Sequence, residues 1–334
     1  MITTFLVFSY SCLNEYTENH RSYSIYNHYL EVYNCFFTRF GLLIGNGGVI
    51  YVNNSLGLEV HDSMFYNCNS SGYGGAIYSF RTNVTINRVC ANSCQGSHGH
   101  FMFFTQEYDA SFVSIFNYVS LSLCAPKTNG YNTLNFQIRQ MYLDNHNHSK
   151  NNAYSGSCMY LNCFEMFNFS FCNIFENRAS YSICIRLSGS SNNQIRYWNI
   201  IDNNSPSNSG VLTFETYNSY VFSNCIIHSN SNSLFSIGSY STVTLSKCAL
   251  YHLFTTKTGS GTFSTQSLTL TKKATYLYSY FASYLCDAVI PLTPNPTRTL
   301  CPSPTLEMTQ TSVITVNIPI GKSPFLFHIF VLFY

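Results

Sequence analysis

Charged side chains are scarce in this sequence, and their scarcity excludes one large class of partner. Asp, Glu, Lys and Arg make up 9% of the 334 residues, whereas ordinary soluble domains carry about 25%. The formal net charge is only +2, and no run of Lys or Arg occurs, so the basic surface of a nucleic-acid-binding protein is missing. We therefore expect no nucleic-acid partner.

Aspartate is especially rare, which argues against carboxylate-based catalysis. The five aspartates are spread along the chain, and no two are adjacent in sequence: Asp62, Asp109, Asp144, Asp202 and Asp287. Hydrolysis of a glycosidic bond needs two carboxyl groups that converge on it, and calcium-dependent cleavage needs clustered acidic ligands. Glu59 and Asp62 share one predicted strand, whereas Asp202 lies several repeats away. We expect no convergent carboxylates, no catalytic residue, no cofactor and no metal.

Long apolar runs are also missing, and the two ends of the chain carry only short ones. Met1–Cys12 has an apolar run without a basic n-region, which makes it a poor or truncated signal peptide. Phe325–Tyr334 has His328 as its single polar residue, but a bilayer span needs about 20 residues. Three interpretations of this end remain: the start of a truncated transmembrane helix, a short signal for a lipid anchor, and an apolar stub that caps the last coil.

Two histidine motifs are weak candidates for sites. Ser97–His100 resembles the Gly-His-Gly element of polygalacturonases, but the acidic motifs of those enzymes are absent, and we interpret the segment as a flexible loop. His146 and His148 lie two residues apart, on one face of an extended chain, where they could bind a metal. We interpret them as part of a polar loop beside a strand end.

Aromatic residues, by contrast, are abundant. They form 17% of the chain, as 27 Tyr and 28 Phe against a single Trp. Ser, Thr and Asn fill most polar positions, so the composition is rich in residues that favour strands and turns. This balance indicates an all-β protein.

One pattern recurs from Cys158 to His252 with a period of about 25 residues. Each copy pairs a short apolar strand with a second strand that ends near an Asn. The first strands are Cys158–Leu161, Ile183–Leu187, Gly210–Phe214 and Ser233–Ile237. The second strands are Asn168–Asn177, Gln194–Asn203, Tyr220–Asn230 and Thr242–His252. Trp198 stands where neighbouring copies have Cys or a small polar residue, so we expect it to fill a widened core.

The same period appears nearer the N-terminus, where two Gly-Gly pairs each open a strand and an Asn closes the next. The repeat-motif residues of this pattern are Gly47, Gly48, Gly74, Gly75, Asn67, Asn92, Asn177 and Asn203. Glycine supplies the positive φ and the space that stacked turns need. Asparagine tolerates the left-handed conformation, and stacked amides can form a ladder of hydrogen bonds.

From this period we predict an all-β fold, a right-handed parallel β-helix (a solenoid) with about 25–27 residues per coil and roughly 8–10 coils. Residues 22–285 would form the β-helix, residues 1–21 a leader or N-terminal cap, and residues 286–324 a Pro/Thr-rich linker. Residues 325–334 would be an apolar segment and a candidate truncated membrane anchor. The alternative is a β-sandwich, which gives no reason for whole motifs to recur in fixed order.

The 14 cysteines admit two interpretations. Cys172, Cys225 and Cys248 hold equivalent repeat positions, so they are predicted to stack as a column of buried thiols. The alternative is a set of disulfides, which is typical of exported proteins. Cys286 and Cys301, outside the repeats, are the better disulfide candidates.

Six Asn-X-Ser/Thr sites are candidates for glycosylation. They are Asn53, Asn69, Asn83, Asn147, Asn168 and Asn203. In a chain rich in Asn and Ser many such sites arise by chance, so they support secretion only weakly.

At Gly47–Tyr51 and Gly74–Tyr78 the chain resembles the repeats of chlamydial polymorphic outer-membrane proteins, which pair a Gly-Gly-Ala-Ile motif with a Phe-X-X-Asn motif. Gly74–Ile77 matches the first motif and Gly47–Ile50 nearly matches it, whereas Met64–Asn67 departs from the second motif at its first residue. The resemblance covers about 50 residues. Similar repeats occur in surface proteins of parasitic protists that have a right-handed β-helix of the pectin-lyase-like type.

This resemblance implies a location at the cell surface or outside the cell, and adhesion to host or cell-surface glycans or proteins. It carries over no catalytic residue. The leading hypothesis is therefore a non-catalytic surface or secreted β-helix protein that acts in adhesion, binding or display, with membrane anchoring at the C-terminus as an open option. The alternatives are a polysaccharide-active, pectin-lyase-like enzyme and a truncated or non-functional gene fragment of such a family.

Overall fold

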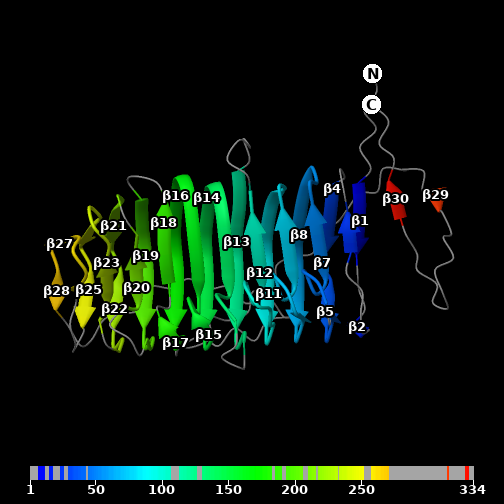
Figure 1. The fold of residues 1–334 in the computed structure, drawn as a ribbon. Helices are drawn as coiled ribbons and strands as arrows, with labels where there is room; N and C mark the ends of the chain where they lie inside the picture. Colours follow the sequence, from blue (N-terminus) through cyan, green and yellow to red (C-terminus); the bar gives the residue numbers. More distant parts are fainter. Residues whose placement is uncertain are drawn as a thin grey trace, which may run out of the picture.

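The computed structural model describes most of the chain between residues 29 and 270. The described ranges are 7–11, 15–17, 23–25, 29–42, 44–106, 113–125, 130–182, 185–189, 193–205, 210–215, 217–231, 233–251, 257–270, 314–315 and 328–330. Within them the chain is all-β, and its parallel strands stack into a solenoid of about eight turns (Figure 1). The predicted parallel β-solenoid is confirmed.

Three columns of parallel strands form the walls of the rod. The first column contains β3 (Tyr23–Ile25), β7 (Ile50–Asn53), β10 (Ile77–Phe80), β12 (Met102–Thr105), the first parts of β14 (Leu134–Ser149) and β16 (Met159–Phe175), β18 (Ile185–Gly189), β20 (Leu212–Phe214), β23 (Phe235–Ile237) and β26 (Lys257–Thr258). Each of these strands pairs in parallel with the strand one coil away.

The second column continues from the first after a turn. It contains β1 (Val7–Ser11), β4 (Tyr29–Tyr33), the first parts of β8 (Gly57–Tyr66), β11 (Asn83–Asn92) and β13 (Val113–Ser122), the middle of β14 and β16, the first part of β19 (Asn193–Ile201), β21 (Ser219–Ser223), β24 (Thr242–Ser246) and β27 (Thr262–Gln266).

The third column contains the last parts of the same long strands. Its shorter members are β2 (Glu15–Thr17), β5 (Phe36–Thr38), β22 (Ile226–His228), β25 (Ala249–Tyr251) and β28 (Thr269–Leu270). Two short pairs lie outside the columns: β6 (Gly41–Leu42) with β9 (Asn69–Ser70), and β15 (Asn152–Ser155) with β17 (Arg178–Ser182). Strands β29 (Ile314–Thr315) and β30 (His328–Phe330) pair with each other, and β30 pairs antiparallel with β1 beside the first coil.

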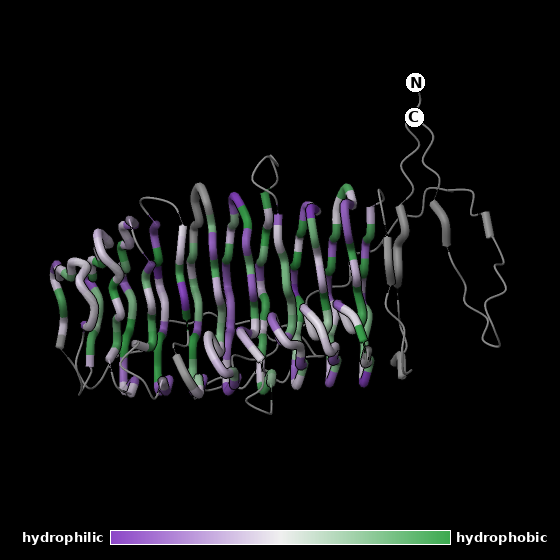
Figure 2. Tube along the Cα trace, in the orientation of Figure 1, coloured by the Kyte–Doolittle hydropathy of each residue, from purple (hydrophilic) through white to green (hydrophobic). Residues whose placement is uncertain are grey.

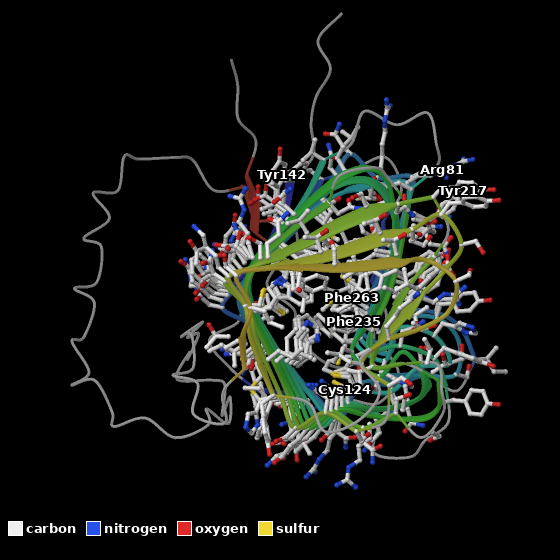
Figure 3. The ribbon with its side chains drawn as sticks, turned by 90° about the vertical axis from the view of Figure 1, so that its left-hand side faces the viewer. Arg81, Cys124, Tyr142, Tyr217, Phe235 and Phe263 are labelled. Carbon is white, nitrogen blue, oxygen red and sulfur yellow. The ribbon has the colours of Figure 1, made fainter. Side chains whose placement is uncertain are left out.

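Alternate residues of each strand face the interior and stack on their equivalents about 4.8 Å away in the next coil. In the second column this inward row is Val32, Val60, Ile86, Phe116, Leu143, Phe169, Ile195, Phe222 and Leu245. Full burial of such a side chain stabilises the fold by roughly 1.5–3 kcal/mol. Figure 2 shows the resulting alternation of apolar and polar residues along the coils, and in the axial view Phe235 and Phe263 point inward while Tyr142, Arg81 and Tyr217 project outward (Figure 3).

Single residues with positive φ bend the long strands between the second and third columns. These corner residues have φ between 47° and 57° and are Asn34, Asp62, Arg88, Tyr118, Asn145, Phe171, Tyr197, Asn224, Lys247 and Ser267. A residue in this left-handed region reverses the side-chain alternation locally, so both halves of the strand present apolar residues to the core. Few of these positions carry the Asn or Gly that would mark them in the sequence.

The Gly-Gly pairs serve the turn that enters the first column. Gly47 and Gly74 both have φ of +67°. A Cβ added at Gly75 would lie 2.0 Å from the carbonyl oxygen of His100 in the next coil. The first glycine therefore supplies the backbone conformation, and the second leaves room for the neighbouring coil.

The asparagines of the predicted motif do not all hold equivalent positions. Asn67 has φ of 53° and forms a corner, whereas Asn92 lies one position earlier in its coil because it pairs with Tyr66. The corresponding corner residues of two later coils are Glu176 and Asp202, and Asn177 and Asn203 lie one position after them. The spacing of the closing asparagines was thus a good guide to the period but not to the register.

The predicted amide ladder is confirmed in the later coils. It consists of Asn151, Asn177, Asn203 and Asn230, which are at most 1% exposed. Each Oδ1 from Asn177 onward accepts bonds of 3.0 Å from the backbone N–H and the Nδ2 of the preceding asparagine. Each Nδ2 also donates to a backbone carbonyl of the preceding coil, as from Asn177 to His148 at 2.9 Å.

The predicted thiol column is also confirmed. Cys172, Cys225 and Cys248 are buried and free, Cys172 pairs in register with Trp198, and the backbone N–H of Cys225 donates to Cys248 Sγ at 3.4 Å. Trp198 is fully buried in line with this column. The alternative prediction, disulfides among these three cysteines, is therefore wrong. Cys90 takes part in a disulfide.

The predicted segment boundaries can be placed only in part. Strands β1 and β2 extend the second and third columns, so they belong to coils. Cys286 and Cys301 lie outside the described residues. In the part of the chain that the structure describes, no helix is long and apolar enough to cross a membrane.

Candidate functional site

A continuous group of aromatic rings covers part of the outer surface of the early coils. We call this group the aromatic stripe, and its members are Tyr51, Tyr73, Tyr78, His98, Phe103, Tyr131 and Tyr154. Three of these rings lie on strands of the first column, and the others precede it, on turns or, for Tyr154, on β15. We call these four the turn set. Both sets follow the rod axis from coil to coil.

The strand set arises from the alternation of β7, β10 and β12. Tyr51, Tyr78 and Phe103 are paired in register, and they face outward because Ile50, Ile77 and Met102 beside them face the core. The rings of Tyr51 and Tyr78 are 5.1 Å apart at 10°, and those of Tyr78 and Phe103 are 5.7 Å apart at 7°. Register thus turns three outward residues into one stack.

The turn set places one ring on each of four successive coils. Ring centroids of Tyr73 and His98 are 5.0 Å apart, those of His98 and Tyr131 are 4.7 Å apart, and those of Tyr131 and Tyr154 are 5.5 Å apart. Tyr73 also stacks on Phe103 at 4.7 Å, which joins the turn set to the strand set. Tyr73, Tyr131 and Tyr154 remain 40%, 40% and 39% exposed.

The aromatic stripe carries no carboxylate and no permanent cation. His98 is its only residue that titrates near neutral pH, and partial burial lowers the pKa of this imidazole from its ordinary value. The imidazole is therefore neutral at pH 7. The rings contact one another face to face or edge to face, so the surface combines apolar ring edges with hydroxyl groups.

A second outward group lies on the second column, on β4 and β8. We call it the tyrosine–glutamate cluster, formed by Tyr29, Glu31, Tyr33, Glu59 and His61. Glu31 and Glu59 are paired in register on neighbouring strands. The hydroxyls of Tyr29 and Tyr33 donate to Glu59, the latter at 3.4 Å, and His61 Nε2 lies 3.3 Å from the same carboxylate.

The charges of this cluster shift its proton affinities. Partial burial, followed by the negative charge of Glu59, raises the pKa of the Glu31 carboxyl. Burial, with the nearby Glu31 and Glu59 carboxylates, raises the pKa of Tyr33 to about 12. Tyr33 also stacks on His61 with centroids 4.8 Å apart.

The expectation of no convergent carboxylates is wrong at this cluster. It compared the aspartates with Glu59 and did not consider Glu31. The signal was present, because Tyr29, Glu31 and Tyr33 alternate along one strand and Glu59 and His61 alternate along another about one period later. Such alternation places all five on the outer face once the strands are in register.

The histidines singled out in the sequence lie mainly in the core. His146 and His148 belong to the third-column part of β14 and are fully buried, so the interpretation as a polar loop is wrong. The positive φ of Asn145 just before them turns both rings inward. His146 Nε2 donates to the Phe116 carbonyl at 3.1 Å, whereas neither ring nitrogen of His148 has a hydrogen-bond partner.

Burial makes these imidazoles resist protonation. It lowers the pKa of His146 to about 3, that of His148 well below its ordinary value, and that of His100 to about 4. His100, from the Ser97–His100 segment interpreted as a loop, is also buried, and its Nδ1 accepts a bond of 3.3 Å from the Gly96 N–H. Within the described ranges, no group of three or more His, Cys, Asp or Glu side chains is arranged to hold a metal.

The candidate glycosylation sites fall in different surroundings. Asn69 and Asn83 are exposed, Asn53 is half-buried, Asn147 and Asn203 are buried, and the side chain of Asn168 lies outside the described part. The Nδ2 of Asn203, to which a glycan would be attached, is engaged in the amide ladder. Glycosylation itself stays a prediction, and the fold offers the most room at the two exposed sites.

Comparison with protein-family models, with curated proteins and with solved structures gives no match. The parallel β-solenoid therefore stands on the structure itself. Only the resemblance of the Gly-Gly motifs points to particular surface-protein families.

Proposed function

We propose that the chain is a non-catalytic surface or secreted protein that acts in adhesion or display, and that the aromatic stripe is its contact surface. The observation that carries this proposal is the unbroken contact of seven rings over neighbouring coils, six of them partly exposed and Phe103 buried. The resemblance of the Gly-Gly segments to repeats of chlamydial and protist surface proteins supports the location. Anchoring of the C-terminus in a membrane belongs to the same proposal.

Ring stacking also stabilises coils, so the extent of the stripe matters. Elsewhere on the described surface, stacked outward pairs such as Phe171 with Tyr197 and Tyr217 with Tyr240 involve rings of two neighbouring coils. The aromatic stripe is longer and combines two parallel sets. A surface of that length can hold an extended partner, for which a single pair of rings is too short.

The proposal is tested by binding of the purified protein to cell surfaces and to arrayed glycans. The triple variant Tyr73→Ala, Tyr131→Ala, Tyr154→Ala is expected to lose binding by at least tenfold, because buried aromatic anchors commonly contribute about 2 kcal/mol each. The matched control is Tyr217→Ala with Tyr240→Ala, a stacked and exposed pair outside the stripe. Equal binding by both variants would remove the aromatic stripe from the proposal, and a purely cytosolic signal after surface labelling of intact cells would remove the location.

A second candidate function, polysaccharide cleavage, is favoured by the in-register pair of Glu31 and Glu59. Two carboxyl groups about one strand spacing apart could act as acid and nucleophile in a retaining hydrolysis. The assay follows reducing ends and unsaturated products from neutral and acidic polysaccharides. Turnover that Glu31→Gln or Glu59→Gln abolishes, and that Asp62→Asn leaves intact, would replace the non-catalytic proposal.

A further inference from the structure

Two stacked tyrosines on the late coils differ from the other aromatic contacts because both rings are largely open to solvent. The ring centroids of Tyr217 and Tyr240 are 5.1 Å apart, and the rings lie within 8° of parallel. Tyr217 is 72% exposed and Tyr240 is 78% exposed, and Tyr217 projects from the rod in the axial view (Figure 3). We call these two residues the exposed tyrosine pair. A dissolved oxidant can reach both phenol rings.

The backbone sets the geometry of the exposed tyrosine pair. Tyr217 and Tyr240 have φ of 68° and 60°, so both occupy the left-handed region, which side chains other than Gly and Asn seldom adopt. Ser219 of β21 pairs with Thr242 of β24, and each tyrosine lies two positions before its strand residue. The Tyr217 N–H donates to the Ser239 carbonyl at 3.4 Å. Equivalent turns of two successive coils therefore hold the rings together.

Two other pairs of tyrosines in contact, in the part of the chain that the structure describes, are less suited to react with each other. Tyr51 and Tyr78 are also 5.1 Å apart and nearly parallel, but both are half-buried. Tyr131 and Tyr154 are 5.5 Å apart and meet edge to face at 77°, with 40% and 39% of their surface exposed. The exposed tyrosine pair alone among these three combines parallel rings with high exposure.

Neighbouring phenols can be joined by oxidation. A haem peroxidase transfers one electron and one proton from each of two tyrosines to one molecule of hydrogen peroxide, which becomes two molecules of water. The two phenoxyl radicals then form a carbon–carbon bond between ring carbons that lie next to the hydroxyl-bearing carbons. The hydrogen on each of these ring carbons moves to the phenoxyl oxygen, so both phenols are restored in the dityrosine product.

We propose that Tyr217 and Tyr240 form a site of oxidative modification, at which a haem peroxidase and hydrogen peroxide generate an intramolecular dityrosine. A partner ring 5.1 Å away gives each radical a local concentration of phenol far above that of other protein molecules in dilute solution. The exposed tyrosine pair lies outside the aromatic stripe, so this inference goes beyond the proposed binding function and does not depend on it.

The cross-link joins two coils at the end of the amide ladder. The coil that begins at Tyr217 contains Asn230, the last residue of the ladder, and Tyr240 belongs to the coil that follows. The bond links residues 23 positions apart (240 − 217 = 23), and such a link restricts the unfolded chain. The modified protein should therefore unfold at a higher urea concentration than the unmodified protein.

The experiment treats the purified full-length protein with a haem peroxidase and hydrogen peroxide at several protein concentrations. Dityrosine fluorescence, the loss of two hydrogens from the intact mass, and peptide mapping identify the product. We expect the first cross-link to join Tyr217 to Tyr240 within a monomer, at a rate independent of protein concentration. Tyr217→Phe and Tyr240→Phe keep both rings but lack one phenol, so each should lose this cross-link and the rise in urea midpoint. Tyr51→Phe is the matched control and should keep both.

Four results would overturn the proposal. The first is the absence of dityrosine from the monomer, and the second is a first cross-link that maps to another pair of tyrosines. The third is a yield that Tyr217→Phe leaves unchanged. The fourth is a product found only in covalent dimers, in an amount that grows with protein concentration, because the radical would then escape capture by the neighbouring ring.

Discussion

The early and late coils use different side chains to bond one coil to the next at the same corner. After the third column, each of these coils turns at a residue with positive φ. The residue that follows this corner is Cys68, Cys94 or Cys124 in the early coils. In the later coils it is an asparagine of the amide ladder, which begins at Asn151. Cys94 Sγ donates to the Phe65 carbonyl of the preceding coil at 3.5 Å, and the asparagine amides make the corresponding bond at 2.7–3.0 Å. The geometry is shared, but the thiol is the weaker donor.

The two halves differ both in these corner bonds and in the side chains on their outer faces. The late coils are joined by neutral, buried amide bonds that repeat without interruption from Asn151 to Asn230. The early coils have the weaker corner and carry the tyrosine–glutamate cluster and most of the aromatic stripe, whose last ring, Tyr154, follows the first ladder residue, Asn151. Outward side chains are free to differ between coils, because the inward and corner side chains supply the contacts that stabilise the coils.

Acid should have the largest effect, and it should act where the two halves meet. His146 and His148 are buried and neutral beside the first rung of the ladder, and burial lowers both pKa values far below 6.5. The unfolded chain takes up protons below about pH 6.5, so stability is full above that pH. It falls by about 1.4 kcal/mol per pH unit for His146 as the pH drops toward its folded pKa of about 3, and His148 adds a loss of the same sign.

Hydrogen exchange as a function of pH measures this effect. Opening should begin in β14 and its neighbours, before the late coils. The variant His146→Leu with His148→Leu should reduce the slope of stability against pH, and a slope equal to that of the wild type would contradict the assignment.

The next largest effect is expected from breaking the ladder. Asn177→Ala removes the acceptor of two bonds, one from the backbone N–H of Asn151 and one from its Nδ2, while the bond from Nδ2 to the Leu121 carbonyl remains. A cost of about 3 kcal/mol in the free energy of unfolding is expected, measured from the urea midpoint. The exposed Asn83→Ala is the control and should change stability by less than about 0.5 kcal/mol.

A smaller effect should separate thiol from amide at the same position. Cys94→Ala removes a small buried side chain with weak hydrogen bonds, so we expect a loss of about 1–2 kcal/mol. If Cys94→Ala cost as much as Asn177→Ala in the same urea titration, the two corners would be energetically alike and the comparison would fail.

The smallest effect, and the sharpest test, is the conversion of one corner into the other. Cys124→Asn would extend the ladder by one rung, because the Cys124 backbone N–H already donates to Asn151 Oδ1 at 3.0 Å. We expect stability to stay within about 1 kcal/mol of the wild type, with a gain as the favoured sign. The reverse change, Asn177→Cys, should cost about 2 kcal/mol, and a larger loss from Cys124→Asn than from Asn177→Cys would show that the early coils cannot accept the amide.

Sequence reasoning went furthest where local patterns repeat. The solenoid, the thiol column with Trp198 and the amide ladder were all predicted from equivalent positions in successive copies. It went wrong where one residue of register decides the outcome. Asn92 was aligned with Asn67 although it lies one position earlier in its coil. His146 and His148 were assigned to a loop although Asn145, a residue type that favours positive φ, forms the corner that turns both imidazoles inward.

The candidate sites were harder to predict than the fold. The tyrosine–glutamate cluster unites Glu31 with Glu59, and the aromatic stripe unites residues from turns and strands of several coils. Coil length is not constant, since Met102 pairs with Leu134 although the other coils are shorter. A fixed period therefore loses the register between His98 and Tyr131, within the stripe.

The sequence by itself determined the all-β character, the approximate coil length and the alternation of inward and outward side chains, because strand alternation and turn residues are properties of neighbouring positions. Only the tertiary structure decided which outward side chains meet. In a solenoid the contacts across the surface come from residues one coil away, and the corner residues with positive φ set the register between coils. The aromatic stripe and the carboxyl pair are products of that register.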